Sequence, residues 1–176
     1  LLVLDVTSNK IMAKGCIDIC KAIQHHTTLR EILMSNNFIG PDGARQLAHK
    51  VLADTKYITE VHLANNGIFP DGAKEIGIAL ANKKYLEVLN LRRNDIGKEG
   101  ISELEKCLMA SRIKELDLSG NKIGDEGCRI VVKSLIDKPK LMITSLNLSD
   151  NAITSEGCKL ICSLVDKARM LDSLQL

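Results

Sequence analysis

LNLRRNDIGKEGI, the stretch from Leu89 to Ile101, decides how this chain folds. Its first part alternates leucine with polar residues, which is typical of a β-strand with one buried face. Asn94 then stands where the apolar alternation calls for another inward-facing residue. Gly100 follows six residues after that asparagine, and a second apolar pattern with helical spacing begins behind it. The stretch therefore predicts a strand, a loop and the start of a helix.

The same arrangement recurs along the whole chain. The pattern L-x-x-L-x-L-x-x-N-x-I, with Ile, Val or Met in some apolar places, occurs in six units. The units start near residues 1, 29, 58, 86, 113 and 143, and a partial seventh starts at 171. Their asparagines are Asn9, Asn37, Asn66, Asn94, Asn121 and Asn151. We expect a single repeat domain over residues 1–176, and a piece of a longer chain because no initiator methionine is present.

The second half of each unit predicts a helix. A glycine stands six residues after each asparagine, at positions 15, 43, 72, 100, 127 and 157. Apolar residues then recur at i, i+3, i+4 and i+7, which marks one face of an α-helix. Pro41 and Pro70 suit the first helical turn, where a missing N–H breaks no hydrogen bond. Acidic residues in that turn stabilise a helix, because they interact favourably with the positive end of its dipole.

The repeated asparagine predicts a ladder of hydrogen bonds rather than a reactive site. Where a strand turns into a loop, backbone groups face the core without a partner, and each buried unpaired group costs roughly 1–3 kcal/mol. An amide side chain carries donors and an acceptor, so it can pair with groups of its own unit and of the next unit. We therefore expect the six asparagines to be structural.

The pattern resembles the leucine-rich repeat, and its period, helix and glycine resemble the ribonuclease-inhibitor-type subfamily. The resemblance implies an α/β solenoid with parallel strands on a concave face and α-helices on a convex face. Parallel strands lie about 4.8 Å apart while packed helices need about 10 Å, so the stack must curve. The subfamily includes ribonuclease inhibitors, Ran GTPase-activating proteins, sensor arms of NOD-like receptors, and ciliary and cytoskeletal proteins. The longest unit predicts an extra loop around Pro139.

The composition argues against two classes of partner. Aromatic residues make up 2% of the chain, and the formal net charge is +2. A nucleic-acid surface needs stacking platforms and many cations, so we expect no nucleic acid. No apolar run approaches the ~18 residues of a membrane span, and the first residues lack the basic start of a signal peptide, so we expect no membrane.

The cysteines predict a reducing compartment and no metal site. Two pairs are spaced i,i+4, but the C-x₂-C knuckle of zinc ribbons is absent, and no histidine stands at ligand spacing from either pair. We interpret all six as reduced thiols packed on helices like small hydrophobes: Cys16, Cys20, Cys107, Cys128, Cys158 and Cys162. Reduced thiols indicate the cytoplasm, and a ciliary, cytoskeletal or nuclear location stays open. No cofactor is expected.

Function is expected on the concave face, because no phosphate loop, zinc-protease or hydrolase motif appears. Strand periodicity turns the third, fifth and seventh residues of each unit toward that face. The candidates for binding a protein are Glu31, Glu60, His62, Asn90, Arg92, Arg93, Glu115 and Asp117. Acidic residues on both sides of an arginine pair suit the reading of a protein surface by its charges. Phe38 and Phe69 either form an apolar spot on the rim or tuck into the core.

We predict a non-catalytic scaffold that binds a protein through the concave sheet and the adjoining loops. The resemblance leaves open a regulator of a small GTPase like the Ran GTPase-activating proteins, a sensor arm of a NOD-like receptor, and a ciliary or cytoskeletal component. Ribonuclease inhibition is disfavoured, because family inhibitors use more repeats with aromatic and acidic anchors. Partner identity and oligomeric state stay open. Both ends fall inside a predicted strand, so we expect flanking sequence or a docking partner to cover them.

Overall fold

Strands and helices alternate along the chain in the computed structural model, which describes residues 1–110, 112–138 and 141–176. The strands are β1 (Val3–Asp5), β2 (Glu31–Leu33), β3 (Glu60–His62), β4 (Val88–Asn90), β5 (Glu115–Asp117), β6 (Ser145–Asn147) and β7 (Ser173–Gln175). The helices are α1 (Met12–Ile23), α2 (Gly40–Leu47), α3 (Phe69–Leu80), α4 (Gly97–Ala110), α5 (Gly124–Ile136) and α6 (Ser155–Lys167). A π-helical turn, η1 (Ala48–Leu52), continues α2. The loop predicted around Pro139 lies outside the described residues.

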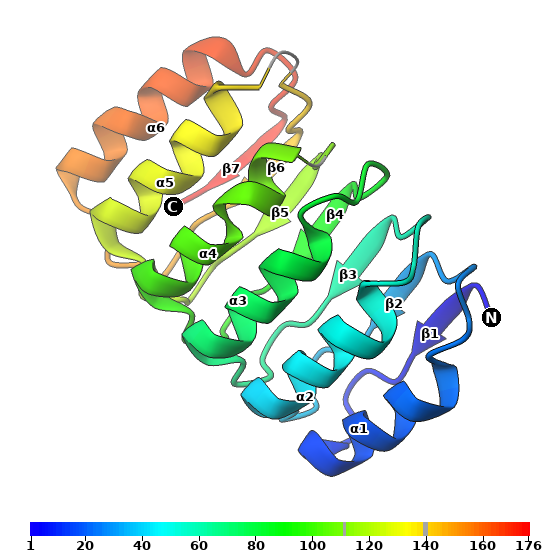
Figure 1. Ribbon diagram of the computed structural model, residues 1–176. Coiled ribbons are helices and arrows are strands. Elements are labelled where there is room, and N and C mark those ends of the chain that lie inside the picture. The colour runs from blue at the N-terminus through cyan, green and yellow to red at the C-terminus, as the bar shows by residue number, and fades with distance from the viewer. Residues whose placement is uncertain (111, 139–140) are drawn as a thin grey trace.

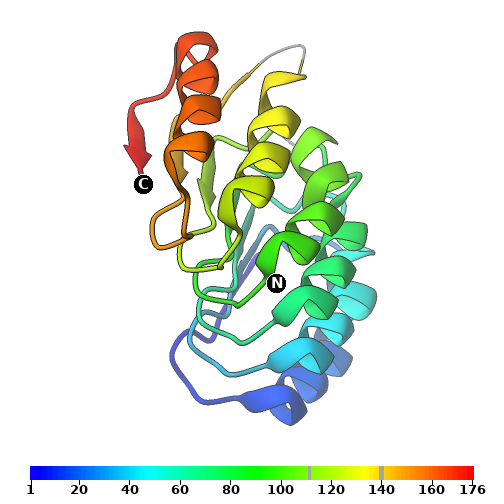
Figure 2. The ribbon, with the colours of Figure 1, turned by 90° about the vertical axis from the view of Figure 1, so that its left-hand side faces the viewer.

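The strands form one open sheet in which every neighbouring pair is parallel. Their order in the sheet is their order in the sequence, from β1 to β7 (Figure 1). All the helices lie on one side of this sheet, and Figure 2 shows the stack as an arc with the strands on its inner side. The predicted curved α/β solenoid is therefore confirmed. Among the described residues, no helix is long and apolar enough to cross a membrane.

Each loop from strand to helix turns through left-handed backbone positions that alternate with buried ones. In the fourth unit, Arg93, Asp95 and Gly97 have φ values of 51°, 53° and 64°. The residues between them, Asn94 and Ile96, are fully buried. The first five units share the three left-handed positions, and the sixth unit keeps the first two of them. This alternation directs the asparagine and the isoleucine into the core and leaves their neighbours at the surface.

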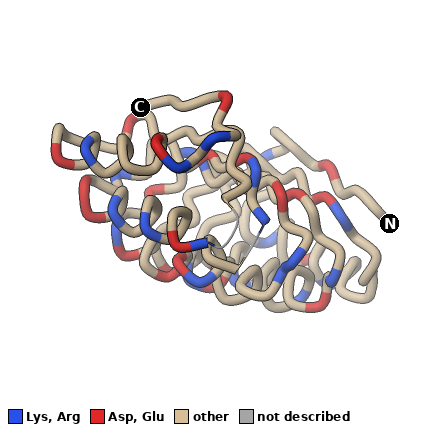
Figure 3. Tube along the Cα trace, turned by 90° about the horizontal axis from the view of Figure 1, so that it is seen from above, with Lys and Arg blue, Asp and Glu red and all other residues tan. Residues whose placement is uncertain are grey.

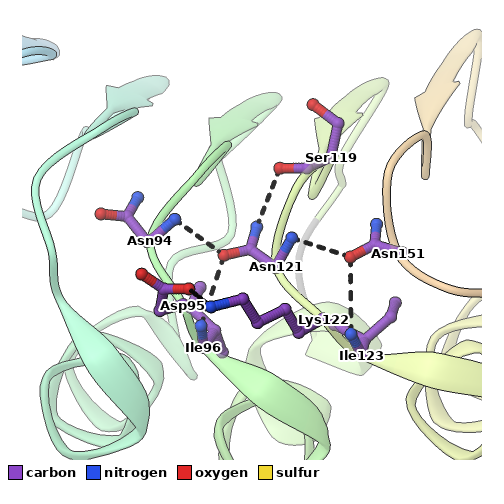
Figure 4. Close-up of polar contacts among 8 residues, drawn as sticks. All are labelled: Asn94, Asp95, Ile96, Ser119, Asn121, Lys122, Ile123 and Asn151. Atoms are coloured by element: carbon purple, nitrogen blue, oxygen red, sulfur yellow. Dashed lines mark hydrogen bonds and ion pairs between the residues drawn. The ribbon is translucent and has the colours of Figure 1, made fainter.

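The buried asparagines form a hydrogen-bonded ladder through the stack (Figure 4). The Asn94 side-chain amide donates to the carbonyl of Leu91 in its own unit (3.0 Å) and of Leu63 in the preceding unit (2.8 Å). Its oxygen accepts from the backbone N–H of Asn66 (2.9 Å). Asn121 accepts from the N–H of Asn94 in the same way (2.9 Å). The prediction of contacts with the next unit was wrong, because each side chain reaches back to the preceding one.

The glycine that follows each asparagine allows the helix to approach its own loop. A Cβ on Gly100 would lie 2.3 Å from Cγ2 of Ile96, closer than any real side-chain contact. The isoleucine fills that space instead and is fully buried with Leu89 and Leu91 of the same unit. Pro41 and Pro70 lie in the first turns of α2 and α3, as predicted. One continuous apolar core therefore joins strands, loops and helices.

Four of the six cysteines pack in this core as free thiols: Cys16, Cys20, Cys107 and Cys128. Burial raises the pKa of Cys107 to about 12, so its thiol stays protonated at neutral pH. Cys158 and Cys162 are exposed on α6. The prediction that they pack like small hydrophobes is wrong in this structure, because α6 packs against α5 on one side and both cysteines lie on the surface of α6 that stays open.

Candidate protein-binding surface

The candidate residues lie along the strand side of the arc, in rows set by the sheet register. The third residues of successive units pair across the strands, and this row contains Glu31, Glu60, Val88 and Glu115. The fifth residues form a second row that contains Leu33, His62, Asn90 and Asp117. Six of the eight candidates thus lie in two neighbouring rows on β2 to β5. Arg92 and Arg93 follow β4 and lie beyond the ends of these rows.

The middle of the two rows is a polar hollow of about 180 Å³. His62 Nε2 lies 3.3 Å from Glu60 Oε2, so the imidazole and the carboxylate share a hydrogen bond on this face. The walls come from β3 to β7 and are His62, Val88, Leu89, Asn90, Glu115, Leu116, Asp117, Ser145, Asn147 and Gln175. Such a lining offers hydrogen bonds and charges to a partner, and little apolar surface.

Some side chains at the fifth position of a unit already accept hydrogen bonds from the same unit. Asp117 Oδ1 accepts from both the N–H (2.9 Å) and the hydroxyl (2.7 Å) of Ser119. Asn90 Oδ1 accepts from the N–H of Arg92 (3.1 Å). These bonds hold the turn after the strand, as short polar side chains do in Asx-turns. Sequence reasoning missed this role, although the recurring Asp or Asn two residues before the seventh position was a visible signal.

The same turn recurs at both ends of the stack. Asp5 Oδ1 accepts from the N–H of Thr7 (3.0 Å), and this bond is the main reason that the pKa of Asp5 lies below its ordinary value. Asn147 Oδ1 accepts from the N–H (3.1 Å) and the hydroxyl (2.7 Å) of Ser149. Asn90 and Asp117 therefore belong to a structural column as well as to the candidate surface.

The two arginines line a second hollow of about 390 Å³ at the end of the strands. Both are exposed, and neither guanidinium forms an ion pair with a described residue. Arg93 has a left-handed backbone. Its side chain lies close to Gly120, so that a Cβ added to Gly120 would be 2.8 Å from Arg93 Cγ. The hollow is lined by Ser35, Asn36, Ala64, Asn65, Asn90, Arg92, Arg93 and Asp117.

Several charged side chains at the concave face have no ion-pair partner among the residues that the structure describes, whereas Glu60 there lies 3.3 Å from His62. Within the described ranges, Glu31 and Glu115 form no ion pair, as is true of the two arginines. On the helices, by contrast, Asp42 binds Arg45 (2.9 Å) and Glu156 binds Lys159 (2.6 Å). Lys and Arg alternate with Asp and Glu along the trace, so no single sign of charge covers the molecule (Figure 3). Glu31, Arg92, Arg93 and Glu115 therefore keep their charges available for another molecule.

The two phenylalanines are exposed at the rim. Phe38 is 59% exposed and Phe69 is 47% exposed, so neither ring tucks into the core. In the part of the chain that the structure describes, no cluster of three His, Cys, Asp or Glu side chains could hold a metal ion.

The comparisons with known proteins agree with the repeat geometry. The family model for the Leucine Rich repeat matches residues 1–20, 82–104, 113–129 and 141–162. The ribonuclease inhibitor of Sus scrofa is 28% identical over 155 residues, which cover 71% of this chain and 34% of that protein. The chain is a leucine-rich repeat protein of the ribonuclease-inhibitor type. This leucine-rich repeat protein is also similar to RAN GTPase-activating protein 2 of Arabidopsis thaliana, with 28% identity over 109 residues. The match covers 61% of this chain and 15% of that relative.

Solved structures share the fold of this leucine-rich repeat protein. The actin-binding site 2 of leiomodin-1 superposes with a TM-score of 0.56 at 16% identity, over 94% of this chain and 79% of that one. An internalin of Listeria monocytogenes superposes with a TM-score of 0.56 at 20% identity, over 98% of this chain and 38% of that one. The chain spans about a third of the length of the ribonuclease inhibitors that it matches.

Proposed function

We propose that this leucine-rich repeat protein is a non-catalytic scaffold that binds another protein through its concave face and the adjoining loops. The observation that supports this function is that Glu31, Arg92, Arg93 and Glu115 have no ion-pair partner among the described residues. Exposed charges that have no intramolecular partner cost little to leave in water, and they select a partner of complementary pattern. The free thiols support a reducing compartment, and we propose the cytoplasm.

The charge pattern also defines the partner. Arg92 and Arg93 are complementary to a carboxylate or another acceptor on the partner. Glu31 and Glu115 are complementary to cations of the partner on either side of that acceptor. Arginine is enriched among the residues that dominate binding energy, because its planar guanidinium makes paired hydrogen bonds to a carboxylate. The partner should therefore present an acidic spot flanked by basic residues.

Affinity purification from the native source, followed by mass spectrometry, tests this proposal. The bait is the wild-type chain or the double variant Arg92→Glu, Arg93→Glu. The matched control is Lys74→Glu with Lys106→Glu, which makes the same change of charge at exposed positions on α3 and α4. We expect the arginine variant to lose partners that the wild type and the lysine variant retain, at an unchanged melting temperature. Capture that survives both arginine changes would contradict the assigned surface.

A second candidate function is the regulation of a small GTPase. The 28% identity to RAN GTPase-activating protein 2 favours it over a receptor sensor arm and over a ciliary or cytoskeletal role. A GTP-hydrolysis assay with purified Ran, with and without the chain, discriminates between regulator and scaffold. Acceleration of hydrolysis supports the regulator, and an unchanged rate supports the scaffold. The sensor-arm and the ciliary or cytoskeletal roles stay predictions.

A further inference from the structure

A second surface of this chain lies where the helices return to the strands. Tyr57 and Tyr85 occupy the same place in successive units, one residue before the buried Ile58 and Leu86. Their ring centroids lie 5.7 Å apart, with 37° between the ring planes. Each tyrosine is 50% exposed. Two of the four aromatic residues of the chain thus pack against each other at the surface.

The tyrosine pair borders a hollow of about 270 Å³ whose other walls are polar or basic. Besides the two rings, the lining residues are Lys56, Asn82, Lys83 and Lys84. The ammonium of Lys83 donates to the carbonyl of Ala53 (2.8 Å), and burial lowers the pKa of this lysine. Lys56 and Lys84 are exposed, and neither pairs with a described residue. The hollow therefore has a fixed floor and two free cations at its mouth.

The fold itself does not require aromatic residues at this place. The equivalent positions of other units hold Thr28, Arg112, Met142 and Met170. A half-exposed ring contributes less to stability than a buried one, because much of its apolar area remains in water. The tyrosines are thus better explained by contact with another molecule than by packing.

The charge around the pair is positive. In residues 53–59, 81–87 and 112–114, five Lys or Arg residues stand against two acidic ones, Asp54 and Glu87. Glu87 is already paired with Lys114 (2.7 Å). An acidic molecule is therefore complementary to this edge, whereas a basic one is repelled.

We propose that Tyr57, Tyr85, Lys56 and Lys84 form a docking site for an acidic, extended segment of a partner protein. The ring faces provide a platform for apolar side chains or prolines, and the two ammonium groups bind carboxylates on either side of it. The site continues from one unit to the next along the edge, so an extended chain can contact both tyrosines. Stacked nucleic-acid bases fit less well, because the rings already contact each other and the net charge is small.

This site is separate from the concave surface. Tyr57 and Tyr85 precede β3 and β4, whereas Arg92 and Arg93 follow β4, so the two surfaces lie at opposite ends of the strands. A variant of one surface therefore leaves the other intact, and failure of one proposal does not imply failure of the other.

Fluorescence anisotropy with a short fluorescein-labelled peptide of alternating glutamate and proline tests the site. Such a peptide is acidic and extended before it binds. We expect the pair Tyr57→Ala, Tyr85→Ala to weaken binding by about tenfold or more, as truncation of anchor residues does. Lys56→Glu with Lys84→Glu should have an effect of at least this size, because it reverses both charges. Tyr57→Phe with Tyr85→Phe keeps the platform and should retain most of the affinity.

The control variants separate binding at this site from binding at the concave surface and from loss of folding. The pair Arg92→Glu, Arg93→Glu should leave peptide binding unchanged, and thermal melting should show that every variant folds. The proposal is overturned if the wild type does not bind the peptide, or if glutamine in place of glutamate binds equally well. Equal binding by the wild type and the tyrosine-to-alanine variant also overturns it. Tighter binding of an oligouridylate than of the peptide would assign the site to nucleic acid instead.

Discussion

Arg93 extends its side chain over Gly120 of the next unit, so that a Cβ on the glycine would lie 2.8 Å from Arg93 Cγ. Gly120 also has a left-handed backbone, with φ of 67°. The contact joins the candidate arginine pair to the loop beyond it. The absence of a side chain on Gly120 thus leaves room for the charged side chain of Arg93.

Gly120→Ala should destabilise the chain by about 2 kcal/mol, from the left-handed backbone and from the collision with Arg93. Gly124→Ala is the control, because Gly124 has a similar φ of 62° but nothing within 4 Å of a Cβ. It should cost about 1 kcal/mol, the backbone part alone. Urea unfolding measures both. If the two variants lose the same stability, the contact with Arg93 has no energetic weight.

Asn94→Ala should lower the free energy of unfolding by about 3 kcal/mol or more, because the buried N–H of Asn66 loses its partner and the carbonyls of Leu63 and Leu91 each lose one of two amide donors. Asn9 offers a comparison within the same ladder. It is exposed, and its amide donates within its own unit alone. Asn9→Ala should therefore cost about 1 kcal/mol or less. Thermal and urea unfolding of both variants measure the difference, and equal losses would contradict the ladder as a source of stability.

The repeat could be predicted from the sequence because tandem packing imposes one spacing on every unit. Asn94 and Gly100 each meet a requirement that is visible within their own unit: an amide that bonds to the Leu91 carbonyl, and a helix start with no room for a Cβ beside Ile96. The direction in which the asparagine reaches was not predictable in this way. It depends on the relative placement of two loops, which the spacing within one unit does not contain.

The sequence predicts which positions belong to the candidate site, but not which hydrogen bonds their side chains form. Strand alternation placed Glu31 and Arg92 on the same face. It could not show that Asp117 would bond to its own turn, because that competition depends on side-chain rotamers. The pairing of Tyr57 with Tyr85 was also missed. The two rings come from different units, and no local pattern marks residues that become neighbours through stacking.

Phe69→Gly should raise the stability of the chain by up to about 1 kcal/mol. Phe69 has a φ of 57° at a position where other units have Gly40, Gly97 and Gly124, and its ring is half exposed. Glycine removes the backbone strain, whereas Phe69→Ala keeps the strain and loses the ring. The alanine variant should therefore be the less stable of the two in urea unfolding. The opposite order would show that the ring packs more favourably than its exposure indicates.

The cysteines should react in two groups. Cys158 and Cys162 are exposed, and iodoacetamide should modify them first at pH 8. Cys107 and Cys128 should stay unmodified, because they are buried and because burial raises their pKa to about 12 and about 11. Peptide mass spectrometry of the folded and the urea-unfolded chain measures both groups. Fast modification of Cys107 in the folded state would show that the core opens readily.

Asp125 anchors the loop of the following unit. Its carboxylate accepts from the hydroxyl of Thr154 (2.6 Å) and from the N–H groups of Thr154 (2.8 Å) and Gly157 (3.0 Å). The pKa of Asp125 lies below its ordinary value of 3.8, chiefly because the Thr154 hydroxyl donates to the charged form. A carboxyl whose pKa is lower in the folded state binds protons more readily when unfolded. Its contribution is therefore complete above pH 3.8 and disappears as the pH falls through the lower, folded-state pKa.

Asp125→Asn should accordingly destabilise the chain at pH 7, and the difference from wild type should shrink as the pH falls below 3.8. At neutral pH the wild-type carboxylate makes charge-assisted hydrogen bonds that the amide cannot reproduce, whereas in acid both side chains are neutral. Asp71→Asn is the control, since Asp71 also lies in a first helical turn but forms no side-chain hydrogen bond with a described residue. Its effect should vary less with pH over the same range. Urea unfolding between pH 2.5 and pH 7 measures both variants, and a gap between wild type and Asp125→Asn that widens in acid would refute the role of the Thr154 bonds.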